Sequence, residues 1–177
     1  MAGSEVSAAD QDQIVVRSAS HRRIARVAAV QTLYQAEIVH KPLAGAAMEM
    51  RKHYLGQNVD GMSLVADKNF YGSIIQAIED NGERLIQLLQ NALDNRRLER
   101  MELILQAILV AGAAELLAIG EAPPKVTISE YVDIADDFFG QPEASLVNAA
   151  LDRIAHLVRP DEFSAIGGSL KTKMNIK

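Results

Sequence analysis

The chain has 177 residues, of which 49% are hydrophobic, enough for one domain or two small packed halves with a sizeable core. Its net charge is −5, so composition gives no general affinity for nucleic acid, and any such binding must be local. There is no cysteine, which excludes disulfides, thiolate metal sites and a cysteine nucleophile. No signal-peptide pattern and no run near 20 apolar residues occurs, so we predict a soluble cytoplasmic protein without a membrane segment.

The first helix is predicted to follow a polar arm. Residues 1–18 are small and polar and include Glu5, so we expect a disordered acidic arm there. The helix is predicted from Ser20, as its N-cap, to about Val39. Its core-facing side is expected to hold Gln31 among the apolar residues Ile24, Val27, Ala28 and Ile38.

Three arginines, Arg22, Arg23 and Arg26, lie together at the start of this predicted helix. Cations are mildly disfavoured near a helix N-terminus, so an anionic ligand such as phosphate is a natural explanation for the cluster. Tyr34 lies on the same line of the helix as Arg23, which would set an aromatic ring beyond a guanidinium and could hold a phosphate and a base together. The alternative is that the arginines pair with carboxylates of a neighbouring helix.

Turn residues separate the elements in the middle of the chain. Residues 43–55 and 65–80 show helical spacing, and a loop over 57–64 contains Asp60-Gly61. Asn81-Gly82 is expected to interrupt or kink the second of these helices before the pattern resumes.

The second half of the chain contains the most hydrophobic segment, residues 98–118, which predicts a central helix with a close crossing at Gly112. Thr127 to Glu130 has capping-box spacing at the start of the next helix, and a last helix is predicted over 142–158. Residues 161–177 are expected to form a loose tail. Because no strand pattern is present, the sequence predicts an all-α protein of about seven helices.

Several short motifs follow one another between residues 20 and 160. They are Ala25-Arg26, Ala29-Val30-Gln31, Leu33-Tyr34, Ile108-Leu109, Glu115-Leu116, Val126, Ile128, Glu130-Tyr131-Val132, Ile134-Ala135, Val147-Asn148 and Leu151-Asp152. In this order they resemble the NusB family of bacterial transcription antitermination factors.

The resemblance implies two small helical bundles packed together, with residues 19–160 as an RNA-binding domain that has no enzymatic activity, cofactor or metal. It also implies binding of boxA-type single-stranded RNA together with NusE, a small-subunit ribosomal protein. This antitermination complex would help RNA polymerase to read through terminators in ribosomal RNA operons. By position, the RNA-binding residues would be Arg22, Arg23, Arg26, Gln31, Tyr34 and Lys125.

Four positions, Val110, Ala114, Ser129 and Leu146, depart from the family's pattern. The first three are interpreted as core or cap substitutions. Leu146 replaces an aromatic residue where the family's RNA and protein partners meet, and leucine stacks less well on a base. Leu146 and Asn148 are therefore predicted to belong to a weakened or retuned partner surface.

Two other interpretations stay open. The chain also resembles the helical RNA-targeting domain of some ribosomal RNA cytosine methyltransferases, but it lacks the glycine-rich cofactor loop and cysteine that such enzymes need. A homodimer could form if the arginines packed on the acidic segment from Asp133 to Asp137 of a second copy. Asp133 and Asp137 have an (i, i+4) spacing that could hold Mg²⁺, but without further ligands we predict a solvated acidic face.

Overall fold

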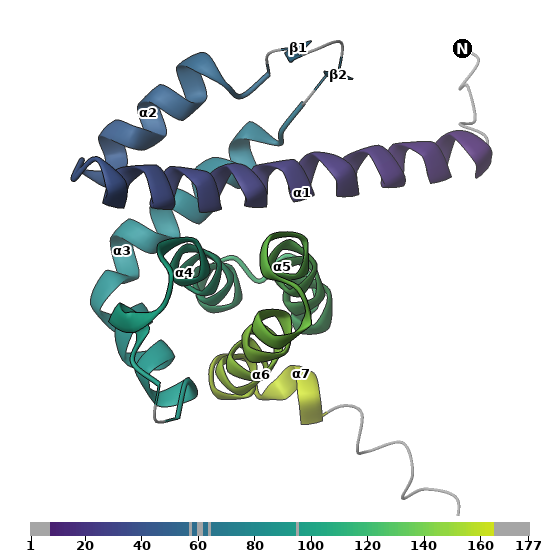
Figure 1. Cartoon of the computed structure of the whole chain (residues 1–177). Helices are drawn as coiled ribbons and strands as arrows, with labels where there is room; N and C mark the ends of the chain where they lie inside the picture. Colours follow the sequence, from purple (N-terminus) through teal and green to yellow (C-terminus); the bar gives the residue numbers. More distant parts are fainter. Residues whose placement is uncertain (1–7, 57, 60–61, 64, 95, 165–177) are drawn as a thin grey trace, which may run out of the picture. The chain divides into compact units, whose positions relative to one another are not determined.

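A computed structural model describes residues 8–56, 58–59, 62–63, 65–94 and 96–164 of the chain. Within these residues the chain is α-helical, as predicted, apart from one short antiparallel hairpin. The helices are α1 (Ala8–Ile38), α2 (Leu43–His53), α3 (Lys68–Ala92), α4 (Leu103–Ala118), α5 (Pro124–Phe139), α6 (Gln141–Val158) and α7 (Asp161–Ser164). The hairpin pairs β1 (Asn58–Val59) with β2 (Met62–Ser63), and a 3₁₀ turn, η1, spans Leu98–Arg100 (Figure 1).

The chain divides into two compact units, Met1–Ile75 and Gln76–Lys177, and the division falls inside α3. The first unit contains α1, α2, the hairpin and the start of α3. The second contains the rest of α3 and the helices that follow. The hairpin lies where the sequence predicts a loop, and the Asp60-Gly61 turn itself lies outside the described residues.

α1 begins much earlier than predicted. It starts at Ala8, so the expected N-cap at Ser20 is wrong, and residues 8–18 of the expected disordered arm are helical. Residues 1–7 lie outside the described part of the chain. Arg22 therefore lies 14 residues inside the helix, beyond the first turn in which the helix dipole acts.

The buried face of α1 is only partly the predicted one: Ala28 is buried as expected, and Ile24 and Val27 are half-buried. Gln31 and Ile38 are exposed, whereas most buried positions are small: Ala25, Ala28, Ala29, Ala36 and Thr32, together with Val30 and Arg26. Alanines allow a neighbouring backbone to approach closely, and α2 packs against α1. The hydroxyl of Thr32 donates to the carbonyl of Ala28 at 2.7 Å and lies 2.9 Å from the hydroxyl of Tyr71 on α3.

α3 runs without a break through Asn81-Gly82, so the predicted interruption is wrong. The Asn81 side chain donates to the carbonyl of Ala77, one turn earlier, and so remains compatible with the helix. Ile74, Ile78 and Leu85 are buried along one side of α3, which maintains the apolar stripe across the glycine.

In the second unit α4, α5 and α6 pack against one another pairwise (Figure 1). The predicted close crossing at Gly112 is confirmed, because a Cβ at this position would lie 2.7 Å from Leu151 Cδ1 of α6. α4 also holds the buried carboxylate of Glu115, which accepts hydrogen bonds from the hydroxyls of Thr127 (3.2 Å) and Tyr131 (3.0 Å) on α5.

The ends of the later helices correct two further predictions. α5 begins at Pro124, so Thr127 lies inside the helix and does not form the predicted capping box. Asp161–Ser164, part of the expected loose tail, form the short helix α7, where the Phe163 ring stacks on His156 at 3.8 Å between ring centroids. Residues 165–177 lie outside the described part of the chain.

Candidate nucleic-acid interface

Two of the predicted arginines lie against one aromatic ring. The guanidinium carbons of Arg22 and Arg26 are 4.9 Å and 5.0 Å from the ring centroid of Phe70, at the start of α3. A cation at this distance from a ring is attracted by about 0.5–1 kcal/mol at exposed sites and more where water is excluded. Phe70 is 4% exposed, so it is a fixed support for both guanidinium groups.

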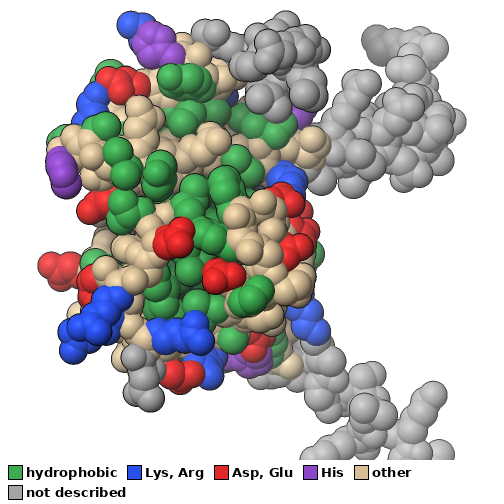
Figure 2. Space-filling view, in the orientation of Figure 1, with side chains coloured by type: hydrophobic (Ala, Val, Ile, Leu, Met, Phe, Trp, Pro, Cys, Tyr) green, Lys and Arg blue, Asp and Glu red, His purple; other side chains and the backbone are tan. Residues whose placement is uncertain are grey.

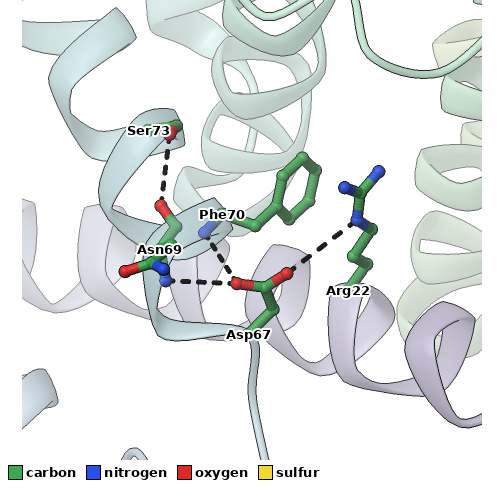
Figure 3. Close-up of polar contacts among 5 residues, drawn as sticks. All are labelled: Arg22, Asp67, Asn69, Phe70 and Ser73. Carbon is green, nitrogen blue, oxygen red and sulfur yellow. Dashed lines mark hydrogen bonds and ion pairs between the residues drawn. The ribbon is translucent and has the colours of Figure 1, made fainter. Parts of the chain in front are cut away.

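Asp67 connects Arg22 to the start of α3 (Figure 3). Its Oδ1 accepts hydrogen bonds from the backbone N–H groups of Asn69 (3.1 Å) and Phe70 (2.9 Å), which caps the helix. Its Oδ2 lies 3.9 Å from Nε of Arg22, and its own backbone N–H donates to the carbonyl of His21 on α1. The segment before α3 is thereby attached to the part of α1 that carries the arginines.

The three arginines differ in exposure. Arg26 is only 3% exposed, which argues against its predicted role as a surface contact to RNA. Its guanidinium instead supports the packing of α1 against Phe70. Arg22 and Arg23 are partly exposed, so their side chains can reach a ligand.

Two further side chains near Arg23 on the helical wheel are solvent-accessible, although Val30, which lies between Arg23 and Tyr34, is fully buried. Gln31 and Tyr34 are exposed, Tyr34 by 40%, and on a helical wheel they fall within about 80° of Arg23. Gln31 was expected to face the core, so its exposure makes it more available to a ligand than predicted. Guanidinium, amide and phenol groups on one face can contact phosphates and bases.

Lys125 belongs to the other unit. It is exposed in the first turn of α5, next to Pro124. Arg22, Arg23 and Tyr34 therefore lie on one helix of the first unit, whereas Lys125 lies in the second unit.

The predicted partner residues Leu146 and Asn148 lie on different sides of α6. Two residues correspond to about 200° of rotation, and Leu146 is half-buried whereas Asn148 is exposed. The two residues do not form one patch. Among the other departures from the family's pattern, Ala114 is fully buried and the Ser129 hydroxyl donates to the carbonyl of Val126 within α5, which is consistent with core and helix substitutions.

Leu146 lines a hollow of about 520 Å³ that the sequence did not reveal. Apolar side chains of α4, α5 and α6 contribute to its wall together with three exposed arginines. The lining residues are Arg96, Arg97, Arg100, Met101, Glu102, Leu105, Phe139, Pro142, Glu143 and Leu146. In Figure 2, Lys and Arg side chains gather beside hydrophobic surface at the lower left of the molecule.

The arginines of this hollow follow the turn after α3, where Asp94 has its own partner, Arg153, at 2.6 Å. A sequence signal was present, since Arg96-Arg97 and Arg100 surround a helix break directly before the central apolar helix. Arginine, aromatic residues and methionine are enriched in protein–protein interfaces. The hollow therefore has the composition of a protein-docking surface.

No group of three or more His, Asp or Glu side chains that could hold a metal ion occurs among the residues described. Over the same part of the chain, none of the helices has the length and apolarity needed to cross a membrane.

A model of the NusB family matches residues 23–156. A transcription antitermination protein NusB from Rhizobium etli is 41% identical over 148 residues, which cover 82% of this chain and 92% of that protein. This chain belongs to the NusB family. A NusB protein from Bradyrhizobium diazoefficiens is 38% identical over 149 residues, covering 83% of this chain and 90% of that protein.

Solved structures of NusB proteins share the fold. NusB of T. maritima superposes with a TM-score of 0.66 at 25% identity, covering 81% of this chain and 96% of that one. A chain from a structure of antitermination factors NusB and NusE in complex with double-stranded RNA gives a TM-score of 0.63 at 17% identity, covering 77% and 97%. At that identity the second likeness concerns the fold alone.

Proposed function

We propose that this chain is a non-enzymatic transcription antitermination factor that binds boxA-type single-stranded RNA together with NusE. In this role it would act in the complex that helps RNA polymerase to read through terminators in ribosomal RNA operons. Family membership supports the antitermination role, because the matched relatives are named transcription antitermination proteins. The fold is also that of a NusB chain crystallised with NusE and double-stranded RNA.

The observation that carries the RNA-binding part is the accessible group of side chains on α1, formed by the exposed Gln31 and Tyr34 and the partly exposed Arg22 and Arg23. In a protein with a net charge of −5, a local basic and aromatic face is the part that can attract a polyanion. RNA would lie along the side of α1 and contact these residues.

The test is a titration of a labelled boxA-type RNA at several salt concentrations. Replacing Arg23 by Ala should weaken binding and reduce the salt slope by about 0.7, the value for one lost phosphate contact on a single strand. Replacing Tyr34 by Ala should cost about 1–3 kcal/mol of stacking with little change in slope. Lys52→Ala, at an exposed position of α2, removes the same charge outside this face and serves as the control. Equal losses for Arg23→Ala and Lys52→Ala would contradict the assignment.

For NusE we propose the hollow around Leu146 as the docking surface, because arginines and apolar side chains meet there. Arg97→Glu should weaken NusE binding at least tenfold and leave RNA binding without NusE unchanged. Arg84→Glu, an exposed position outside the hollow, makes the same charge change and should have little effect on NusE. If both variants bind NusE as the wild type does, the docking surface lies elsewhere.

The homodimer stays a prediction beside this function. Sedimentation at several salt concentrations tests it, since charge-driven pairing weakens as salt rises.

A further inference from the structure

Asp67 places a negative charge inside the proposed RNA-binding face. Its two carboxylate oxygens have different contacts: Oδ1 caps α3 through the N–H groups of Asn69 and Phe70, and Oδ2 faces Arg22 (Figure 3). The cap and the backbone bond from Asp67 to His21 together fix the carboxylate beside α1. A phosphate that approaches Arg22 must therefore approach Asp67 as well.

The ion pair between Arg22 and Asp67 is loose. Its shortest separation is 3.9 Å, longer than a charge-assisted hydrogen bond, and the two side chains are 31% and 33% exposed. A phosphate oxygen at hydrogen-bonding distance from the guanidinium would form the stronger contact. Oδ2 can lose this contact while Oδ1 continues to cap α3.

Phe70 also holds the guanidinium of Arg22, through a contact in which Oδ2 of Asp67 takes no part. The ring centroid is 4.9 Å from Cζ of Arg22, and the ring is 4% exposed. Neutralising Asp67 would thus change the charge next to Arg22 without removing this support.

We propose that Asp67 sets the RNA affinity of this interface, because its Oδ2 competes with an RNA phosphate for Arg22 and repels that phosphate. The inference rests on the proposed RNA-binding function. Asp67 acts through Arg22 and is a positioning residue that keeps binding weaker and less dependent on salt than the arginines alone would make it.

The decisive variant is Asp67→Asn, since asparagine caps helices as well as aspartate does but carries no charge. It should bind boxA-type RNA about threefold more tightly. This factor corresponds to removing the repulsion between the Asp67 carboxylate and a phosphate, taken as two unit charges about 6 Å apart in water. The salt slope should become steeper by up to about 0.7, because the positive charge of Arg22 is no longer offset by Asp67. The midpoint of thermal unfolding should stay unchanged.

Glu79→Gln is the matched control. It removes one exposed carboxylate from the same helix, 12 residues further on, which is about 18 Å along α3 and beyond the Debye length of about 8 Å at physiological salt. Its RNA affinity should equal that of the wild type. In an Arg22→Ala background the gain from Asp67→Asn should disappear, because no arginine then holds a phosphate beside Asp67.

The outcomes separate this inference from the proposed function. Wild-type protein that binds no RNA would remove both. Wild-type protein that binds RNA while Asp67→Asn binds equally or more weakly would overturn the role of Asp67 alone. An equal gain from Glu79→Gln, or a gain that persists with Arg22→Ala, would also overturn it, because general repulsion would then explain the effect.

Discussion

Two glycines inside helices should respond in opposite directions to the same substitution. At Gly112 of α4, an added Cβ would lie 2.7 Å from Leu151 Cδ1 and 3.2 Å from Tyr131 Cδ2, and both of these side chains are fully buried. At Gly82 of α3, nothing lies within 4 Å of the added carbon. Alanine favours a helix over glycine by about 0.5–1 kcal/mol at either position. Overpacking a tight core costs about 1–3 kcal/mol, and this cost applies to Gly112 alone.

Gly82→Ala should therefore raise the free energy of unfolding by about 0.5–1 kcal/mol, whereas Gly112→Ala should lower it by up to about 2 kcal/mol. The two variants should differ by about 1–3 kcal/mol, since that is the overpacking cost. Urea unfolding followed by circular dichroism would show this as a gap of about 0.5–1.5 M between the midpoints, for a slope near 2 kcal/mol/M. Equal midpoints, or a more stable Gly112→Ala, would refute the close crossing of α4 and α6.

Two further predictions concern buried hydroxyl groups. Glu115→Ala should destabilise the protein by about 2–6 kcal/mol, because the hydroxyls of Thr127 and Tyr131 lose a buried acceptor at about 1–3 kcal/mol each. Glu115→Gln, which keeps an acceptor oxygen, should cost less in the same urea assay. Tyr71→Phe should cost about 1 kcal/mol, because the hydroxyl contact with Thr32 is lost. Burial raises the pKa of Tyr71 above its ordinary value near 10, so the fold favours the neutral phenol. That contribution to stability is complete below pH 10 and is lost as pH rises through the raised pKa, and a pH series of unfolding midpoints should show a smaller decline for Tyr71→Phe.

The helical class and most helix boundaries could be predicted because the apolar spacing is strong from residue 43 onward. α1 shows where this reasoning fails. The larger aliphatic residues, such as Ile38, suggested the core face, but the buried face consists mostly of alanines with Thr32, Val30 and Arg26. The prediction ranked residues by their transfer free energy, which favours large aliphatic side chains. A close contact between two helices instead requires small side chains.

A local turn signal was misleading where tertiary packing determines whether a helix continues. Asn81-Gly82 is a frequent turn pair, yet the buried stripe of Ile78 and Leu85 on its two sides keeps α3 helical. The hollow around Leu146 could not be predicted, because it needs the relative positions of α4, α5 and α6. The sequence placed Arg96 and Arg97 beside a helix break but did not connect them with Leu146.

The anion-binding role of the arginine cluster was inferred from a position at a helix N-terminus, which the structure does not have. Arg22, Arg23 and Arg26 were expected at a helix N-terminus, where the dipole and free N–H groups would help to bind an anion, but α1 begins at Ala8. Any attraction for phosphate must therefore come from the guanidinium groups themselves. Since Arg26 is buried against Phe70, Arg22 and Arg23 supply the positive charge offered to a ligand among the described arginine side chains of α1. With so few cations, one nearby carboxylate changes the local charge substantially, which is why the charge of Asp67 should be measurable in RNA binding.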